Sequence, residues 1–257
     1  MLPRAQYGFD LGTLKSSWPA SYLWGGDPFL PEHYKTGLAK RTQFESPAVA
    51  AAIQAQADLI NKLHVAPTAD DTKALTPPSG GVFATGKIAM TTALIPGTYK
   101  NLVDATFKWG VAPLPRQKDN KPTVFNGTWF IAKGSKNPDA TWELIKYLVS
   151  EDNARDMAQT TGFLVPLKGY AAEWLKLLNG PTGMSADDLR KVTEGGLKIG
   201  VENVNHLFVD WPQLNTAIND MLNPVFDGKT TADAAIREAK PKVDAQVQGT
   251  YDQYSRK

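Results

Sequence analysis

Aromatic side chains in loops are the residues of this sequence whose types and spacing suit a chemical task. A flat ring on a loop can pack on the C–H face of a sugar, while neighbouring Asn, Asp and backbone groups bind its hydroxyls. The candidates for such a platform are Trp18, Tyr22, Trp24, Asp27, Tyr99, Asn126, Gly127 and Trp129. Burial in a core is an equally weighted alternative for each individual Trp.

Turn-forming residues surround these candidates. The stretch 7–31 lacks a helical period and is punctuated by Trp18-Pro19 and Trp24-Gly25-Gly26-Asp27-Pro28. Tyr99 follows Pro96-Gly97-Thr98, and Trp129 follows Asn126-Gly127-Thr128. Gly and Pro at such positions favour loops and turns, so the sequence predicts aromatic rings at loops and strand ends.

A phosphate-binding motif is present but lacks its context. Gly81-Val82-Phe83-Ala84-Thr85-Gly86-Lys87 fits the core of a phosphate-binding loop, yet Ile88 stands where a Ser or Thr must hold magnesium. The segment leads into strand-like Ile88-Ala89-Met90 instead of a helix. We therefore predict an ordinary loop before a strand.

Histidine and carboxylate residues indicate neither a metal site nor a catalytic site. His33, His64 and His206 have no ligand spacing, and no Cys supports them. We expect His33 in a polar loop and His64 at a helix end. Asp27 is the one carboxylate beside the Trp cluster and has no evident partner for glycoside hydrolysis. No metal, no cofactor and no enzyme activity are expected.

Composition narrows the class of protein. The chain has 257 residues, 28 Lys and Arg against 26 Asp and Glu, a net charge of +2 and no Cys. A charge this close to neutral argues against a nucleic-acid partner, and the lack of Cys excludes disulfides and Cys-ligated clusters. The sequence has no run of about 18 apolar residues, so no segment is expected to insert into a membrane. The amino terminus has no apolar run typical of a signal peptide.

Hydrophobic periodicity and turn residues predict an α/β protein. Helix starts are indicated at Ser46-Pro47, Asn137-Pro138, Ser150 and Ser185, and Trp142 and Trp174 are expected in the core. Strands are expected at residues 7–9, 88–90, 107–111 and 124–132, and further helices over 211–222 and 231–247.

Several short segments follow one another in the order of a known family. They are Phe44-Glu45-Ser46-Pro47, residues 58–67, Phe83 to Met90 with Pro96-Gly97-Thr98-Tyr99, Trp109 to Pro115, Asn126-Gly127, Ile131 to Pro138, Leu148 to Glu151 and Thr161 to Pro166. Together they resemble the extracellular solute-binding protein family 1, the carbohydrate-binding components of ABC importers. Tyr99 replaces the family's usual Trp, and Asn126-Gly127 replaces its two glycines, which leaves hinge flexibility to Gly127.

The resemblance implies an α/β, periplasmic-binding-protein-like (type II) architecture of two lobes joined by crossing strands, with the ligand in the cleft between them. On this mapping, residues 1–124 and 168–257 form the carboxy-terminal-type lobe. Residues 125–167 are the hinge crossing and the returning segment of an incomplete amino-terminal-type lobe. The first part of that lobe and the export signal have no counterpart, so we expect a fragment with unpaired strand edges.

The function implied by the resemblance is capture of a sugar or oligosaccharide and its delivery to the membrane permease of an ABC importer. The full-length parent is then extracellular or periplasmic and membrane-associated. Within the same fold, a non-sugar polar solute such as glycerol phosphate is the alternative ligand. A carbohydrate-active enzyme with an aromatic-lined groove is the less favoured alternative.

Overall fold

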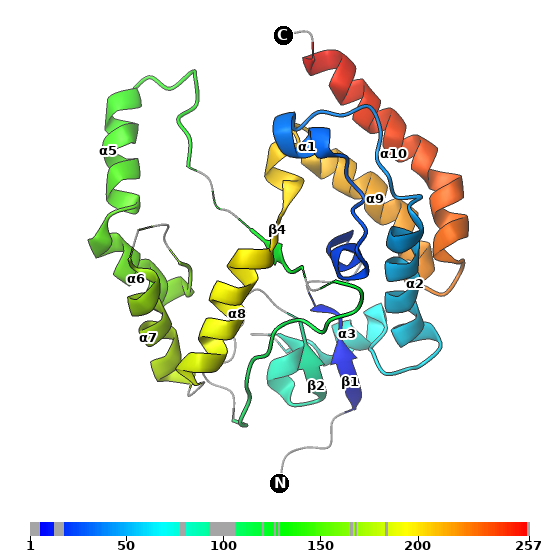
Figure 1. Cartoon of the computed structure of the whole chain (residues 1–257), viewed down its shortest axis with the longest axis horizontal. Coiled ribbons are helices and arrows are strands. Elements are labelled where there is room, and N and C mark those ends of the chain that lie inside the picture. The colour runs from blue at the N-terminus through cyan, green and yellow to red at the C-terminus, as the bar shows by residue number, and fades with distance from the viewer. Residues whose placement is uncertain are drawn as a thin grey trace.

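The computed structural model describes residues 6–12, 18–77, 81–92, 106–119, 121–125, 127, 129–164, 167, 169–182 and 185–255 (Figure 1). Its α-helices are α1 (Pro31–Thr36), α2 (Pro47–Asn61), α3 (Ala69–Leu75), α5 (Pro138–Leu148), α6 (Glu151–Thr161), α7 (Ala171–Thr182), α8 (Ala186–Ile199), α9 (Trp211–Phe226) and α10 (Ala232–Tyr254). Short 3-10 helices are η2 (Trp18–Trp24), η3 (Val82–Thr85) and η4 (Val204–Leu207). The strands are β1 (Tyr7–Asp10), β2 (Ile88–Thr91), β3 (Thr123–Val124) and β4 (Val201–Glu202).

The strands form two small parallel sheets among the described residues. β1 pairs with β2, with Phe9 opposite Met90, and β3 pairs with β4, with Val124 opposite Glu202. Parallel pairing joins segments that are far apart in sequence. The second sheet therefore brings the segment before Trp129 next to the segment that leads into α9.

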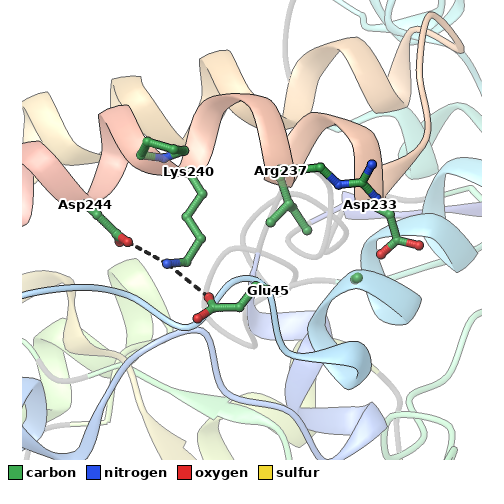
Figure 2. A pocket seen from close by; sticks show the side chains of 8 residues that line it. Glu45, Asp233, Arg237, Lys240 and Asp244 are labelled. Atoms are coloured by element: carbon green, nitrogen blue, oxygen red, sulfur yellow. Dashed lines mark hydrogen bonds and ion pairs between the residues drawn. The ribbon is translucent and has the colours of Figure 1, made fainter.

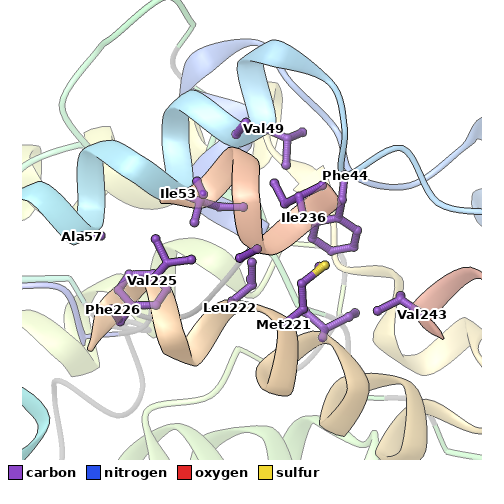
Figure 3. Packing of buried hydrophobic residues seen from close by; sticks show 14 of the residues in the cluster. Phe44, Val49, Ile53, Ala57, Met221, Leu222, Val225, Phe226, Ile236 and Val243 are labelled. Carbon is purple, nitrogen blue, oxygen red and sulfur yellow. The ribbon is translucent and has the colours of Figure 1, made fainter. Parts of the chain in front are cut away.

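The larger hydrophobic core lies between α2, α9 and α10. The predicted apolar stripe of α2 is confirmed, because Val49 and Ile53 are buried. In Figure 3 the side chains of Ile53, Leu222 and Ile236 point into one cluster, and all three are at most 3% exposed. Burying each such side chain contributes about 1.5–3 kcal/mol. Ser46 occupies the predicted N-cap position, but its side chain makes no capping hydrogen bond.

A second, smaller core lies between α6, α7 and α8. Ala154 and Ala158 of α6 are fully buried against Trp174 of α7 and Leu189 of α8. The Trp174 indole Nε1–H donates to the carbonyl oxygen of Gly162 at 3.0 Å. The prediction that Trp174 packs in a core is confirmed. This core combines residues from both sides of position 167/168, and the assignment of 125–167 to a separate lobe stays a prediction.

Two predicted N-caps are confirmed at the helices of the second core. Ser150 accepts a hydrogen bond from the Asn153 backbone N–H, and Ser185 accepts one from the Asp188 N–H at 3.1 Å. Each satisfies a backbone donor that a helix end leaves unpaired.

Two predicted strands are not formed within the described residues. Phe107 to Val111 is not a strand, because Trp109 and Val111 pack against the second core instead of pairing with another strand. Of residues 124–132, only Val124 belongs to a strand, β3. The stretch 7–31, expected to be loops after its first strand, contains η2, and α1 begins at its last residue, Pro31.

Helix α5 lies at the edge of the molecule, on the left in Figure 1, and follows a long connection from β3. The helix is where the sequence predicts it, but none of its residues is buried. Trp142 is 53% exposed, so its predicted place in the core is wrong. The reason is that the part of α5 that carries Trp142 faces solvent, whereas Ile145 and Leu148 are partly buried.

Candidate ligand-binding site

A chain of hydrogen bonds joins η2 to α1 through three side chains. The Tyr22 hydroxyl bonds the Tyr34 hydroxyl at 2.7 Å, and the Tyr34 hydroxyl donates to Asp27 Oδ2 at 2.7 Å. Asp27 Oδ1 accepts from the Phe29 backbone N–H at 2.8 Å. Burial raises the pKa of the Asp27 carboxyl, and it also raises the pKa of both tyrosines. Tyr22 is only 3% exposed, so its ring is part of the core.

Trp24 is the last residue of η2, and the loop that carries the cationic residue Lys118 lies beside this end of η2. The backbone N–H groups of Lys118 and Asp119 donate to the carbonyl oxygen of Leu23 at 3.0 and 2.9 Å. Gly25 adopts a positive φ of 71°, and a Cβ there would meet the Lys118 stem at 3.3 Å. Trp24 is half-buried and Lys118 is exposed.

The β3–β4 pair borders this region. Gly200 precedes β4, where a Cβ would stand 2.3 Å from Val124 Cγ2 of β3, so only glycine allows the close approach. Glu202 of β4 is exposed, and its negative charge is one of the causes that raise the pKa of Tyr34. Asp27 and Glu202 therefore place two carboxylates near one tyrosine hydroxyl. Carboxylates and hydroxyls of this kind can accept hydrogen bonds from a polyol.

Trp129 occupies a separate segment beyond β3. Trp129 is 55% exposed. A Cβ at Gly127, two residues earlier, would have no atom within 4 Å. An exposed indole can supply an apolar face and one N–H donor to a ligand. Tyr99, Asn126 and the side chain of Trp18 lie outside the described residues.

His33 differs from the sequence prediction of a polar loop. It lies on α1, is 0% exposed, and packs between the rings of Phe29 and Phe208, with centroid distances of 5.5 and 4.9 Å. Its Nδ1 accepts from the Leu30 N–H at 3.0 Å, while Nε2 is buried without a hydrogen-bond partner. Burial lowers the pKa of His33 to about 4. A neutral, enclosed imidazole cannot reach a ligand.

The segment that matches the core of a phosphate-binding loop has the structure of an ordinary turn. The segment 81–87 forms η3, a turn at Gly86 with φ 71°, and then β2, as expected for a loop before a strand. Within the described part of the chain, no three His, Cys, Asp or Glu side chains gather as metal ligands would. None of the helices described combines the length and apolar character that crossing a bilayer requires.

A cavity of about 450 Å³ lies between the start of α2 and α10 (Figure 2). Lys240 Nζ is 3.1 Å from Glu45 Oε2 and 2.5 Å from Asp244 Oδ2, and its side chain is 14% exposed. Asp244 Oδ1 in turn accepts from the backbone and hydroxyl of Thr42, each at 2.8 Å. These ion pairs and hydrogen bonds connect the loop that precedes α2 with helix α10. The cavity has no aromatic lining residue, so it does not provide the ring platform that the sequence predicts.

Residues 13–180 match the family model of the bacterial extracellular solute-binding proteins, which is more than half of the chain. The chain belongs to this family. The resemblance seen in the sequence is thereby confirmed, and the family is one of binding proteins and not of enzymes. No curated protein sequence matches this solute-binding protein.

Solved structures agree with the family match. An ABC substrate-binding protein from Listeria monocytogenes in complex with cycloalternan has a TM-score of 0.74 at 18% identity, over 93% of this chain and 58% of that one. A solute-binding protein from Thermotoga lettingae bound with alpha-D-tagatose has a TM-score of 0.68 at 22% identity, over 94% of this chain and 59% of that one. UgpB from Mycobacterium tuberculosis in complex with glycerophosphocholine has a TM-score of 0.64 at 18% identity, over 98% of this chain and 60% of that one. Identities this low show the fold alone.

These likenesses confirm the predicted periplasmic-binding-protein-like α/β fold. The chain spans less than two thirds of the length of each of the three proteins. Over the part of the fold that it does span, helices predominate and the sheets are small.

In this solute-binding protein, the structure brings together some of the predicted site residues. Tyr22, Trp24 and Asp27 lie on one short segment, and Tyr22 and Asp27 share a hydrogen-bonded chain. Trp129 stands apart on the segment after β3. Sequence reasoning missed Tyr34 and Glu202, because only the folded chain brings α1 against η4, which follows β4, and so lets Glu202 influence Tyr34.

Proposed function

We propose that the protein captures a sugar or oligosaccharide with two parts of its surface, the region formed by η2, α1 and the β3–β4 pair, and the segment after β3 that carries Trp129. The observation that carries the proposal is Trp129, which is 55% exposed on the segment that follows β3. An indole left in water at that position is suited to stack on the apolar face of a sugar. The ligands in two of the matched structures, cycloalternan and tagatose, support this choice.

The polar part of the proposed site is supplied by Glu202 and Asp27. Tyr34 holds Asp27 at 2.7 Å, so that carboxylate is already oriented by the protein. Glu202 is exposed, and carboxylate oxygens can accept hydrogen bonds from sugar hydroxyls. Oriented acceptors cost less conformational entropy on binding than free ones.

Delivery of the bound solute to the permease of an ABC importer, outside the cytoplasm, completes the proposal. The family description as extracellular supports the location. Deleting the gene should then reduce uptake of the sugar that the protein binds, while uptake of unrelated sugars stays unchanged.

A phosphodiester solute is the second candidate. The likeness to UgpB bound to glycerophosphocholine favours it, as does the exposed Lys118 beside Trp24. A cation at that place can bind a phosphate group.

Isothermal titration calorimetry of the full 257-residue chain separates the two candidates. We expect heat of binding with maltose, maltotriose or tagatose, and a roughly tenfold loss of affinity in Trp129→Ala, equivalent to about 1.4 kcal/mol. Trp142→Ala, which removes an equally exposed indole on α5, is the matched control and should bind normally. Binding of glycerophosphocholine alone, weakened by Lys118→Ala, would favour the phosphodiester. Binding of neither class by a folded chain contradicts both.

A further inference from the structure

The Asp27 carboxylate of the proposed site takes its direction from the start of helix α1. Tyr34 of α1 donates its hydroxyl to Asp27 Oδ2 at 2.7 Å, and the Phe29 backbone N–H donates to Asp27 Oδ1 at 2.8 Å. The two donors lie on either side of Pro31, where α1 begins. The orientation of Asp27 therefore depends on how the chain enters this helix.

His33 fixes that entry through a reciprocal pair of hydrogen bonds. The Leu30 backbone N–H donates to His33 Nδ1 at 3.0 Å, and the His33 backbone N–H donates to the Leu30 carbonyl oxygen at 3.0 Å. Leu30 is the N-cap residue of α1, and His33 is its third helical residue. A side-chain acceptor at this position that binds the N-cap N–H holds the first turn in place.

The His33 ring is enclosed, so it cannot rotate away from Leu30. It is 0% exposed and lies between the rings of Phe29 and Phe208. At the other end of α1, Gly37 has a φ of 70°, and a Cβ there would stand 2.0 Å from the Leu207 carbonyl oxygen. Because close-packed groups transmit strain, a change at His33 Nδ1 must move the first turn of α1.

We propose that His33 is a positioning residue of the ligand site: its Nδ1 acceptor holds the first turn of α1, which places the two donors that orient Asp27. The contact between Asp27 and a ligand rests on the proposed function. The effect of His33 on Asp27 does not, because it is a property of the chain without ligand.

Protonation of His33 removes the acceptor. A neutral imidazole whose Nδ1 accepts carries its proton on Nε2, whereas an imidazolium donates from both nitrogens. In the charged form, Nδ1–H and the Leu30 N–H are two donors that face each other. Acid therefore releases the first turn of α1.

The charges that act on His33 come from two helices. Among the described side chains, Glu32 on α1 and Asp244 on α10 favour the charged imidazole, and Asp244 is itself paired with Lys240. Burial outweighs them and lowers the pKa of His33 to about 4. The acceptor is therefore present at neutral pH and is lost as the pH falls through 4.

Two substitutions separate the acceptor from the ring. His33→Asn keeps a side-chain oxygen that can accept from the Leu30 N–H but has no ring, whereas His33→Phe keeps a ring but has no acceptor. Neither side chain titrates. If Nδ1 acts as proposed, Asn retains the orientation of Asp27 and Phe loses it. A role confined to packing predicts the reverse, because Phe fills the space between the two rings better than Asn.

Carbon-13 NMR of the Asp27 carboxyl in the full 257-residue chain measures the orientation without ligand. The signal is identified by its absence in Asp27→Asn. Hydrogen bonds from Phe29 and Tyr34 lower the pKa of this carboxyl, while burial raises it. We expect the titration midpoint to rise in His33→Phe and to keep the parent value in His33→Asn. His64→Asn, which replaces an exposed histidine, is the matched control and should leave the midpoint unchanged.

Isothermal titration calorimetry with maltotriose at pH 7 measures the consequence for binding. We expect His33→Asn to bind like the parent and His33→Phe to bind at least about fivefold more weakly, which corresponds to the loss of about one hydrogen bond. Circular dichroism establishes that each variant is folded at the temperature of the titration.

The inference and the proposed function fail in different ways. A higher Asp27 midpoint in His33→Phe, in a chain that binds no sugar, supports the effect of His33 on Asp27 and contradicts the proposed function. Unchanged midpoints in both variants, equal shifts in both, or a shift in His33→Asn alone overturn the positioning role. A higher midpoint with unchanged sugar affinity excludes Asp27 from the ligand site and overturns it as well.

Discussion

Leu222 of α9 and Leu144 of α5 are the same residue type on two amphipathic helices, and they end in opposite environments. Leu222 is 0% exposed in the cluster that α2, α9 and α10 form, whereas Leu144 is 54% exposed. Both helices begin with Pro at an early position and both are apolar on one side. An amphipathic pattern therefore requires that one face of a helix be buried, but it does not supply the surface that buries this face.

Leu222→Ala and Leu144→Ala remove the same atoms from the two regions. Leu222→Ala should lower the free energy of unfolding by about 2–5 kcal/mol, because it leaves a cavity in a packed cluster. Leu144→Ala should change it by less than about 0.5 kcal/mol. Urea unfolding at a concentration where the chain is monomeric measures both. Equal effects would show that α5 is packed as tightly as α9.

His33 makes the larger core sensitive to acid. Its folded-state pKa of about 4 lies below the ordinary 6.5, so between these values the unfolded chain binds the proton more readily. The free energy of unfolding should therefore fall as the pH falls from 6.5 to 4, by up to about 3 kcal/mol. In His33→Gln the slope of stability against pH should be flatter over this window.

The matched control for the acid effect is His64→Asn. His64 is exposed and has a φ of 52°, a backbone conformation that Asn tolerates. The pH series of this variant gives the baseline for replacing an exposed histidine, against which the change in His33→Gln is compared. If His33→Gln retains the full slope, other groups carry the acid sensitivity.

Tyr34→Phe tests the hydrogen-bonded chain at the candidate site. The substitution removes the hydroxyl that bonds both Tyr22 and Asp27, and half-buried polar partners left without it should cost about 1–3 kcal/mol. Thermal unfolding measures the loss. Tyr147→Phe on α5, where the ring is 56% exposed, should leave the midpoint unchanged.

Two serines at N-cap positions differ by one hydrogen bond. Ser185 accepts from the Asp188 N–H, whereas Ser46 makes no capping bond. Ser185→Ala should lower the free energy of unfolding by about 1 kcal/mol, and Ser46→Ala by clearly less. Chemical denaturation of the two variants side by side checks the difference; a larger loss in Ser46→Ala would contradict the capping argument.

Helices were the predictable part of this fold. The apolar spacing of α2, α9 and α10 and the caps at Ser150 and Ser185 indicated elements that the structure contains. Strands were less predictable, because a strand forms only with a partner. Phe107 to Val111 has strand-like composition, but its Trp109 and Val111 pack against the second core.

The candidate site was predictable only in part. The Gly- and Pro-rich surroundings indicated Trp24 and Asp27, since turn residues act through local backbone conformation. Tyr34 and Glu202 were not predictable, because the influence of one on the other depends on the packing of α1 against η4, which follows β4. His33 was misplaced for the same reason: Phe208, one of the two rings that enclose it, comes from a segment far away in the sequence.

The sequence alone was sufficient to predict α2, α5, α6, α8, α9 and α10, the caps at Ser150 and Ser185, the near-neutral charge and the resemblance to solute-binding proteins, because each depends on local spacing or on composition. It did not predict α1, α3 or α7. Tertiary structure decided which apolar faces are covered. It buried Leu222 and His33 and left Trp142 and Trp129 in solvent. Burial is a property of contacts between segments that are remote in sequence, and no local pattern specifies which surface will meet which partner.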